Sequence, residues 1–179
     1  MCFALITRPH LAVSFFSSVA NSVGLDAEGW APLLHMETLV REPLVVMAAT
    51  PLPARMRLAD VADLQLVLPS RPNALRQLLE KESQPKGLTL KVVAEVDSIQ
   101  TVLSLVARGV AATVLPASSL REWTRDIPPF IAAIHAPVIR NRLILAVPKA
   151  RPATRLSRFV VQLTRELAKR HYGQDAQVP

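Results

Sequence analysis

The stretch that decides the fold is EVDSIQTVLSLVARGVAATVLPAS, residues 95–118. A helix is predicted to begin after Asp97 or Ser98, either of which can act as its N-cap, and to end at Gly109. Its apolar residues recur at helical spacing: Ile99, Val102, Leu103 and Val106. The apolar run 110–116 follows and reads as a buried strand. These residues therefore predict a strand, a helix and a second strand in direct succession.

The residues before this stretch extend the same pattern. A strand is predicted over 64–69, a helix after Ser70 or Asn73, and a further strand over 88–96. Apolar strands alternating with helices from 64 to 116 are typical of a parallel sheet that is covered on both faces. Ligands of such sheets bind at the carboxyl ends of the strands. Those ends are predicted at residues 69–73, 96–99 and 116–119.

Further elements are expected on either side of this core. The predicted strands are 2–7, 33–40, 43–49, 130–137 and 141–149. The predicted helices are 12–25, 58–64, 117–126 and 154–172, of which the last is long and amphipathic. The fold class is therefore α/β.

Polar residues at two strand ends are candidates for ligand binding. Ser70, Arg71 and Asn73 add donors to the first amides of a helix, where the helix dipole is positive, and a carboxylate or sulfate suits that environment. The stretch EVDSIQTV, residues 95–102, repeats the arrangement at the next strand end. The alternative, that Ser70, Asn73 and Ser98 only cap their helices, stays open.

The charge of this chain is concentrated near its C-terminus. The 179 residues carry a net charge of +7, and residues 138–179 supply it with nine Lys/Arg against two acidic residues, 9 − 2 = +7. Basic segments can bind nucleic acid, but this one has no interleaved aromatic residues for base stacking, so we interpret it as a solvated surface. Cys2 is the only cysteine, which excludes an internal disulfide and fits a reducing compartment.

The sequence offers no constellation for catalysis. It contains no GxGxxG, GxxxxGK[ST], HExxH, GxSxG or CxxC motif, and its four histidines, at positions 10, 35, 135 and 171, are far apart. We therefore expect no enzyme activity, no cofactor and no metal. Because the chain also has neither a basic-then-apolar leader nor an uncharged apolar run of ~18 residues, we expect a cytoplasmic protein without a membrane partner.

Residues 95–118 resemble the most recognisable part of the effector-binding domain of LysR-type transcriptional regulators. Three further stretches resemble the same domain in the correct order: VREPLVVMAA (40–49), LVLPSRPNALRQLLE (66–80) and PVIRNRLILAVPKARPATRLSRFVVQLTREL (137–167). The resemblance covers roughly residues 30–170. It implies a fold like that of the type 2 periplasmic binding proteins, with two α/β lobes joined by two crossovers and the effector between them.

On this chain the resemblance implies three segments. Residues 1–50 would be a partial first lobe, 51–137 a complete second lobe, and 138–179 the return strand and C-terminal helix of the first lobe. The family begins with a winged helix-turn-helix and a linker helix, which we do not find. The run CFALIT (2–7) resembles a later strand of the first lobe, so we expect an N-terminally truncated fragment. In the family, the opening loop of the first lobe contacts the effector and its opening helix helps form the dimer, and the resemblance implies that this fragment lacks both.

The implied function is a small-molecule effector-sensing domain of a bacterial transcription regulator. Its first partner would be a small-molecule effector, and the donors around Ser70 suit an anionic one. In the full regulator, other copies of the protein would form a dimer or higher oligomer. DNA would be contacted only through a domain absent here. The alternative is a solute-binding protein of the same fold. We expect seven residues to bind the effector: Thr50, Ser70, Arg71, Asn73, Ser98, Ile99 and Gln100. All of them except Ile99 are expected to face a common cleft.

Two expectations concern the isolated chain. It should show no sequence-specific DNA binding, because base readout needs an element placed in a groove. Its first lobe should be the softer half and should expose apolar surface, so the chain should self-associate or need a partner.

Overall fold

Two compact units make up the chain: residues 42–141 form one, which we call unit 2, and residues 1–41 with 142–179 form the other, unit 1. The computed structural model describes residues 5–8, 11–17, 33–123, 128–150 and 154–172, the first two ranges by their backbone. Strands β3 (Leu34–Ala48) and β9 (Arg140–Pro148) each run from one unit into the other. They are the two crossovers that were expected.

Unit 2 is longer at both ends than the predicted second lobe, 51–137, because it starts at Glu42 and ends at Asn141. The separate strands predicted at 33–40 and 43–49 are one strand, β3. The second half of β3 pairs antiparallel with β7 (Thr113–Pro116) and β8 (Phe130–Ala136), placing Val45 opposite both Leu115 and Ala133. That half therefore belongs to the sheet of unit 2.

The sheets of unit 2 combine both strand directions. β5 (Leu66–Leu68) pairs parallel with β6 (Val92–Glu95), and a parallel bridge from Leu66 to Ala112 joins β5 to the start of β7. β4 (Arg55–Arg57) pairs parallel with β8. The predicted parallel arrangement of the three strands between 64 and 116 is confirmed, and β3 runs in the opposite direction. Burial on both faces is wrong for β6, in which partly buried and exposed residues alternate and none is fully buried.

The helices of unit 2 begin and end close to the predicted residues. They are α2 (Leu58–Ala62), α3 (Ala74–Ser83) and α4 (Ile99–Ala107). Gly109 ends α4 with a φ of 72°, in the left-handed region that favours glycine. The helix predicted at 117–126 is a 3₁₀ turn, η2 (Ala117–Glu122), and another such turn, η1 (Gln84–Lys86), follows α3.

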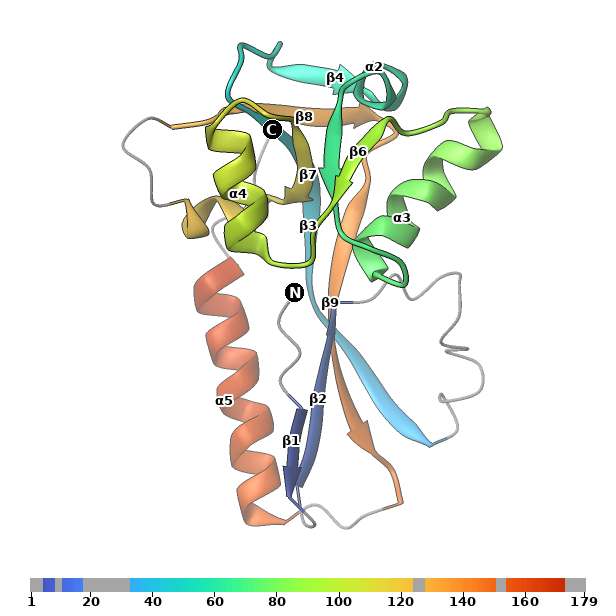
Figure 1. Ribbon diagram of the computed structural model, residues 1–179. Helices are drawn as coiled ribbons and strands as arrows, with labels where there is room; N and C mark the ends of the chain where they lie inside the picture. The colour runs from blue at the N-terminus through green and yellow to red at the C-terminus, as the bar shows by residue number, and fades with distance from the viewer. Residues whose placement is uncertain (1–4, 9–10, 18–32, 124–127, 151–153, 173–179) are drawn as a thin grey trace. The chain divides into compact units, whose positions relative to one another are not determined.

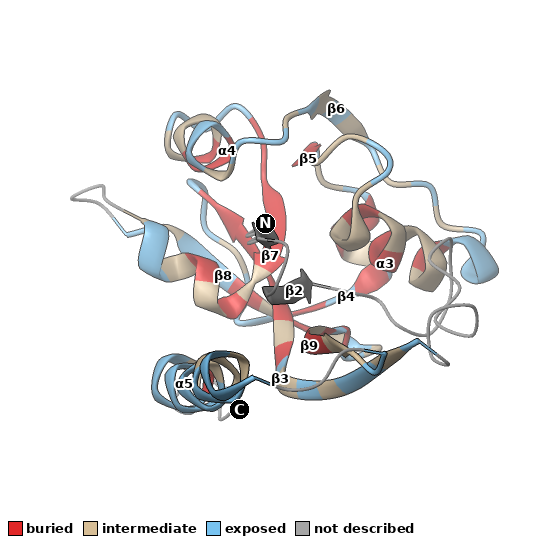
Figure 2. Cartoon of the chain, turned by 90° about the horizontal axis from the view of Figure 1, so that it is seen from below, coloured by how far each residue is buried: buried red, intermediate tan, exposed pale blue. Residues whose placement is uncertain are grey.

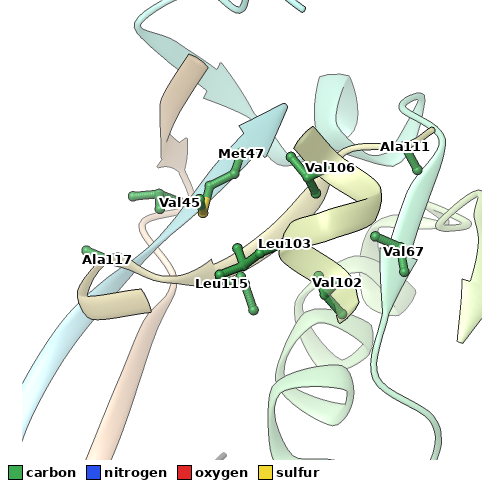
Figure 3. Close-up of a cluster of buried hydrophobic side chains, with 9 residues drawn as sticks. All are labelled: Val45, Met47, Val67, Val102, Leu103, Val106, Ala111, Leu115 and Ala117. Atoms are coloured by element: carbon green, nitrogen blue, oxygen red, sulfur yellow. The ribbon is translucent and has the colours of Figure 1, made fainter. Parts of the chain in front are cut away.

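A hydrophobic cluster fixes α4 against the strands (Figure 3). Val102, Leu103 and Val106 of α4 meet Val45 and Met47 of β3, Val67 of β5 and Leu115 of β7 in this cluster, and all are buried. Full burial of each such side chain contributes about 1.5–3 kcal/mol. The cluster therefore holds the start of α4 in a defined place beside the ends of the strands.

Unit 1 contains two short N-terminal strands and the terminal helix. β1 (Leu5–Arg8) pairs antiparallel with β2 (Leu11–Ser17), and β2 pairs antiparallel with β9. The helix predicted at 12–25 is wrong as far as residue 17, because Phe15 and Ser14 pair with Leu145 and Ala146 of β9. Residues 18–25 of that prediction lie outside the described residues. Long-range pairing has overridden the local helical spacing.

The terminal helix α5 (Arg155–Tyr172) is mostly exposed (Figure 2). Ala168 is its buried residue, whereas four large apolar side chains are exposed: Leu156, Phe159, Leu163 and Leu167. Arg165 Nη2 forms an ion pair with Glu37 of β3 at 2.7 Å. The pairing raises the pKa of Arg165 through the hydrogen bond. The basic residues of this helix are exposed, so most of their side chains are solvated.

Candidate functional site

Three loops of unit 2 begin at the same edge of its parallel strands. Because β5, β6 and β7 are parallel, the loops after Leu68, Glu95 and Pro116 start at the same edge of the sheet (Figure 1). A backbone hydrogen bond from Val96 N to Leu68 O at 2.9 Å ties the first two strand ends together. We call this place the carboxyl edge.

Ser70 and Asp97 are bonded to each other at the carboxyl edge. The amide N of Ser70 donates to Oδ1 of Asp97 at 3.0 Å, and Ser70 Oγ donates to Oδ2 at 2.8 Å. Both donors of Ser70 therefore hold one carboxylate. The prediction that Asp97 could be the N-cap of α4 is wrong, because its oxygens accept hydrogen bonds from the neighbouring loop and Ser98 is the N-cap. Ser98 directly follows Asp97, so these bonds tie the loop that contains Ser70 to the residue before the N-cap of α4.

Ser98 and Asn73 cap the two helices that start at this edge. Ser98 Oγ accepts from Thr101 N at 3.4 Å. Asn73 Oδ1 accepts from Leu75 N at 2.9 Å and from Arg76 N at 3.4 Å. Both residues thus cap their helices, as the sequence predicts. A role in effector binding stays a prediction for both.

Arg71 and Arg76 converge on one carboxylate, that of Glu80. Arg71 Nη2 and Arg76 Nε both bond Glu80 Oε1, and Arg76 Nη1 also reaches Glu95 Oε1 at 3.3 Å. The Arg76 side chain is buried, whereas that of Arg71 is 61% exposed. Partial burial would raise the pKa of Glu80, but the hydrogen bonds from the two arginines outweigh it and lower that pKa. The Arg71 side chain, predicted to face a ligand, is bound instead to the helix that follows it.

Ile99 and Gln100 occupy the first turn of α4. Ile99 is partly buried and packs against the hydrophobic cluster, so its visible role is structural. Gln100 Nε2 donates to Glu122 Oε2 at 3.0 Å, linking α4 to η2. Both residues belong to the carboxyl edge by position.

Thr50 is not brought to the carboxyl edge. Met47 of β3 lies opposite Thr113 at the start of β7, whereas Leu44 lies opposite Pro116 at its end. Thr50 comes two residues after the end of β3 at Ala48, and so follows the part of β3 that lies beside the amino end of β7. Its neighbour Ala49 is 4.0 Å from the Cβ that Gly109 would carry, and Gly109 precedes β7. The common-cleft prediction is wrong for Thr50, because β3 and β7 are antiparallel.

Glu42 was missed by the sequence analysis. It lies at the start of unit 2, next to the paired residues Leu44 and Pro116, and only 5% of it is exposed. Glu42 Oε2 accepts from Ser118 N at 3.2 Å, and Oε1 accepts from Asn141 Nδ2 at 3.4 Å. The sequence feature that could have indicated Glu42 is a carboxylate inside the apolar run VREPLVVM. The proline next to it does not interrupt the strand. Glu42 joins the two crossovers to the loop after β7.

The residues that the structure describes do not form a recognisable metal site. They contain no group of three His, Cys, Asp or Glu side chains placed to hold a metal ion. His135 of β8 is partly buried, and its Nδ1 has no hydrogen-bond partner. The carboxyl edge is thus a set of hydrogen-bond donors and acceptors suited to binding.

Among the residues that the structure describes, no helix is both long and apolar enough to cross a membrane.

Comparison with known proteins assigns this chain to a family. The family model "LysR substrate binding domain" matches residues 24–169, which include both crossovers and all of unit 2. The chain belongs to this family. Its mixed α/β architecture is accordingly the periplasmic-binding-protein-like fold that the resemblance implied.

Individual relatives agree with the family match. The nitrogen assimilation regulatory protein nac of Escherichia coli (strain K12) is 27% identical over 113 residues, which are 63% of this chain and 37% of that protein. The Synechocystis PCC6803 CcmR regulatory domain, solved with 2-PG, superposes with a TM-score of 0.71 at 15% identity, covering 88% of this chain and 73% of that one. The effector binding domain of QuiR, solved with shikimate, gives 0.68 at 21% identity, covering 89% and 72%. At these identities the two structures show the fold. The chain spans little more than a third of the length of the nac protein.

Proposed function

We propose that this LysR substrate-binding domain senses a small-molecule effector for a transcriptional regulator, and that the carboxyl edge of unit 2 contributes to the effector site. The observation that carries the proposal is the bidentate contact of Ser70 with a carboxylate, at 3.0 and 2.8 Å, where three parallel strands end. Such edges are where α/β sheets bind ligands. The related domains solved with 2-PG and shikimate support it by analogy.

The site residues that we propose are the predicted ones that follow the ends of β5 and β6 along the chain. They are Ser70, Arg71, Asn73, Ser98, Ile99 and Gln100, and Thr50 is left out. Arg71 can turn to a ligand only by releasing Glu80. We also propose that the chain is not an enzyme, acts in the cytoplasm, and reaches DNA and other copies as part of a longer regulator, as the nac relatives suggest. No observation favours the alternative, a solute-binding protein.

The experiment is a binding screen with assigned amide signals. A library of small carboxylates and their neutral amides is tested with the 179-residue chain by thermal shift, and hits are titrated in ¹H–¹⁵N spectra. We expect a hit to shift the amides of residues 69–73 and 96–100. Ser98→Gly, which retains much of the helix capping, should weaken that binding by at least about tenfold if the hydroxyl holds the ligand, a loss of ~1.4 kcal/mol.

Thr50→Ala is the matched control, because it removes a hydroxyl at the opposite edge of unit 2. It should leave the dissociation constant of every hit unchanged. Hits that bind with no effect at residues 69–73 and 96–100, or that respond equally to both substitutions, would contradict the proposed site.

A further inference from the structure

A carboxylate already sits in the place where an acidic effector would bind Ser70, and it belongs to the chain itself. The two Asp97 oxygens take both donors of Ser70, one from the backbone and one from the side chain. Two parallel donors to one carboxylate are the geometry by which proteins recognise such groups. The loop after β5 is therefore a formed carboxylate position.

The backbone holds Asp97 in register with that position. Val96 N bonds Leu68 O at 2.9 Å, and Val96 packs against the hydrophobic cluster below α4. On the other side of Asp97, Ser98 is fixed as the N-cap of α4. An internal ligand presented by a fixed backbone has a high effective concentration, so a free carboxylate must compete with it.

The cation next to Ser70 in the sequence is bound to a different carboxylate. Arg71 follows Ser70 directly, but its guanidinium is bound to Glu80. Asp97 itself is exposed, so a displaced Asp97 side chain would be solvated by water. Displacement is thus feasible, although a second carboxylate arriving beside Asp97 is repelled.

We propose that Asp97 is an internal competitor that occupies the carboxylate position of Ser70 and so determines which effectors bind there. An acidic effector reaches Ser70 only by displacing Asp97. The proposal rests on the proposed function in taking the carboxyl edge as the effector site. It differs from the expectation that Ser70 freely offers its donors to an anion.

The test uses sodium acetate as the probe and acetamide as its neutral counterpart, at constant ionic strength. Binding to the whole chain is followed by the amide shift of residue 70 in wild type, Asp97→Ala and Asp97→Asn. We expect acetate to bind Asp97→Ala at least about tenfold more tightly than wild type, Asp97→Asn to show a smaller gain, and acetamide to show none. Adding Ser70→Ala to Asp97→Ala should abolish the gain.

Asp63→Ala is the matched control for charge. Asp63 is exposed and pairs with Lys91 at 3.1 Å, and these residues precede β5 and β6, at the opposite edge of the sheet. This variant should bind acetate as wild type does. Equal acetate affinity in wild type and Asp97→Ala, or an equal gain in Asp63→Ala, would overturn the proposal. A library without hits on wild type would contradict the proposed function alone, because the acetate test does not need the natural effector.

Discussion

At the scale of single residues, the hydrogen bonds of the carboxyl edge separate capping from ligand binding. The side-chain oxygens of Asn73 and Ser98 each accept hydrogen bonds from backbone amides in the first turn of a helix. The sequence predicted these caps because Ser and Asn before an apolar helical pattern are strong N-terminal signals. Ser70, which looked like a third cap, bonds Asp97 instead. Its partner lies 27 positions away, so local sequence could not supply it.

We predict that Asn73→Ala lowers the free energy of unfolding by about 1 kcal/mol, because two α3 amides lose their acceptor. Asn73→Asp should retain the stability, since aspartate caps equally well and its charge suits the helix N-terminus. Urea denaturation followed by circular dichroism measures both. A loss in Asn73→Asp as large as in Asn73→Ala would show that capping is not what this side chain contributes.

At the scale of elements, the ion pairs of α3 decide how the helix is held. Arg76 is buried, and Glu80 is its main partner, while Glu82 on the same helix pairs with Lys86 at 3.7 Å between more exposed side chains. A charge left buried without its partner is costly, whereas exposed pairs contribute little. The helical pattern of this stretch was evident from the sequence, but which of its acidic residues mattered was not.

We predict that Glu80→Ala destabilises the protein by roughly 2–3 kcal/mol, because Arg76 keeps only the more exposed Glu95. Glu82→Ala, the matched control, should change stability by less than about 0.5 kcal/mol. Chemical denaturation of both variants checks this. Equal effects of the two substitutions would refute the role given to Glu80.

The lowered pKa of Glu80 also predicts a pH dependence. A carboxyl whose pKa is lower in the folded state than in the unfolded state stabilises the fold fully above its unfolded value, and this stabilisation is lost as the pH falls through the folded value. The free energy of unfolding should therefore fall on acidification below the ordinary pKa of glutamate. Glu80→Ala should show a shallower fall than wild type over the same acidic range, measured by urea titrations at each pH.

At the scale of the whole molecule, segments of the two units differ in how far their residues are buried. Residues 111–115 of unit 2 are all buried, whereas none of residues 34–41 of unit 1 is. The helix α5 of unit 1 also leaves large apolar side chains exposed, which favours association with another chain. The expectation that residues 1–50 are the softer half thus stays a prediction, now for the described part of unit 1.

We predict that, in a dilute monomeric sample, the amides of residues 111–115 exchange with solvent most slowly and those of residues 34–41 and 155–172 exchange at least about tenfold faster, because local opening exposes poorly buried segments first. Native-state hydrogen exchange read by mass spectrometry or nuclear magnetic resonance measures this. Equal protection of the two sets would contradict the prediction and point to packing in unit 1 beyond the described contacts.

The sequence by itself determined the local features of this protein: where α3 and α4 begin, that Gly109 ends α4, which face of α4 is apolar, and that three parallel strands alternate with these helices. Such features depend on neighbours within a few positions along the chain. Only the tertiary structure decided that β3 runs antiparallel to β7, which moves Thr50 to the opposite edge, and that Ser70 holds Asp97 while Glu42 bonds Ser118 and Asn141. These outcomes depend on strand direction and on pairs distant in sequence, which no local pattern of residue types can specify.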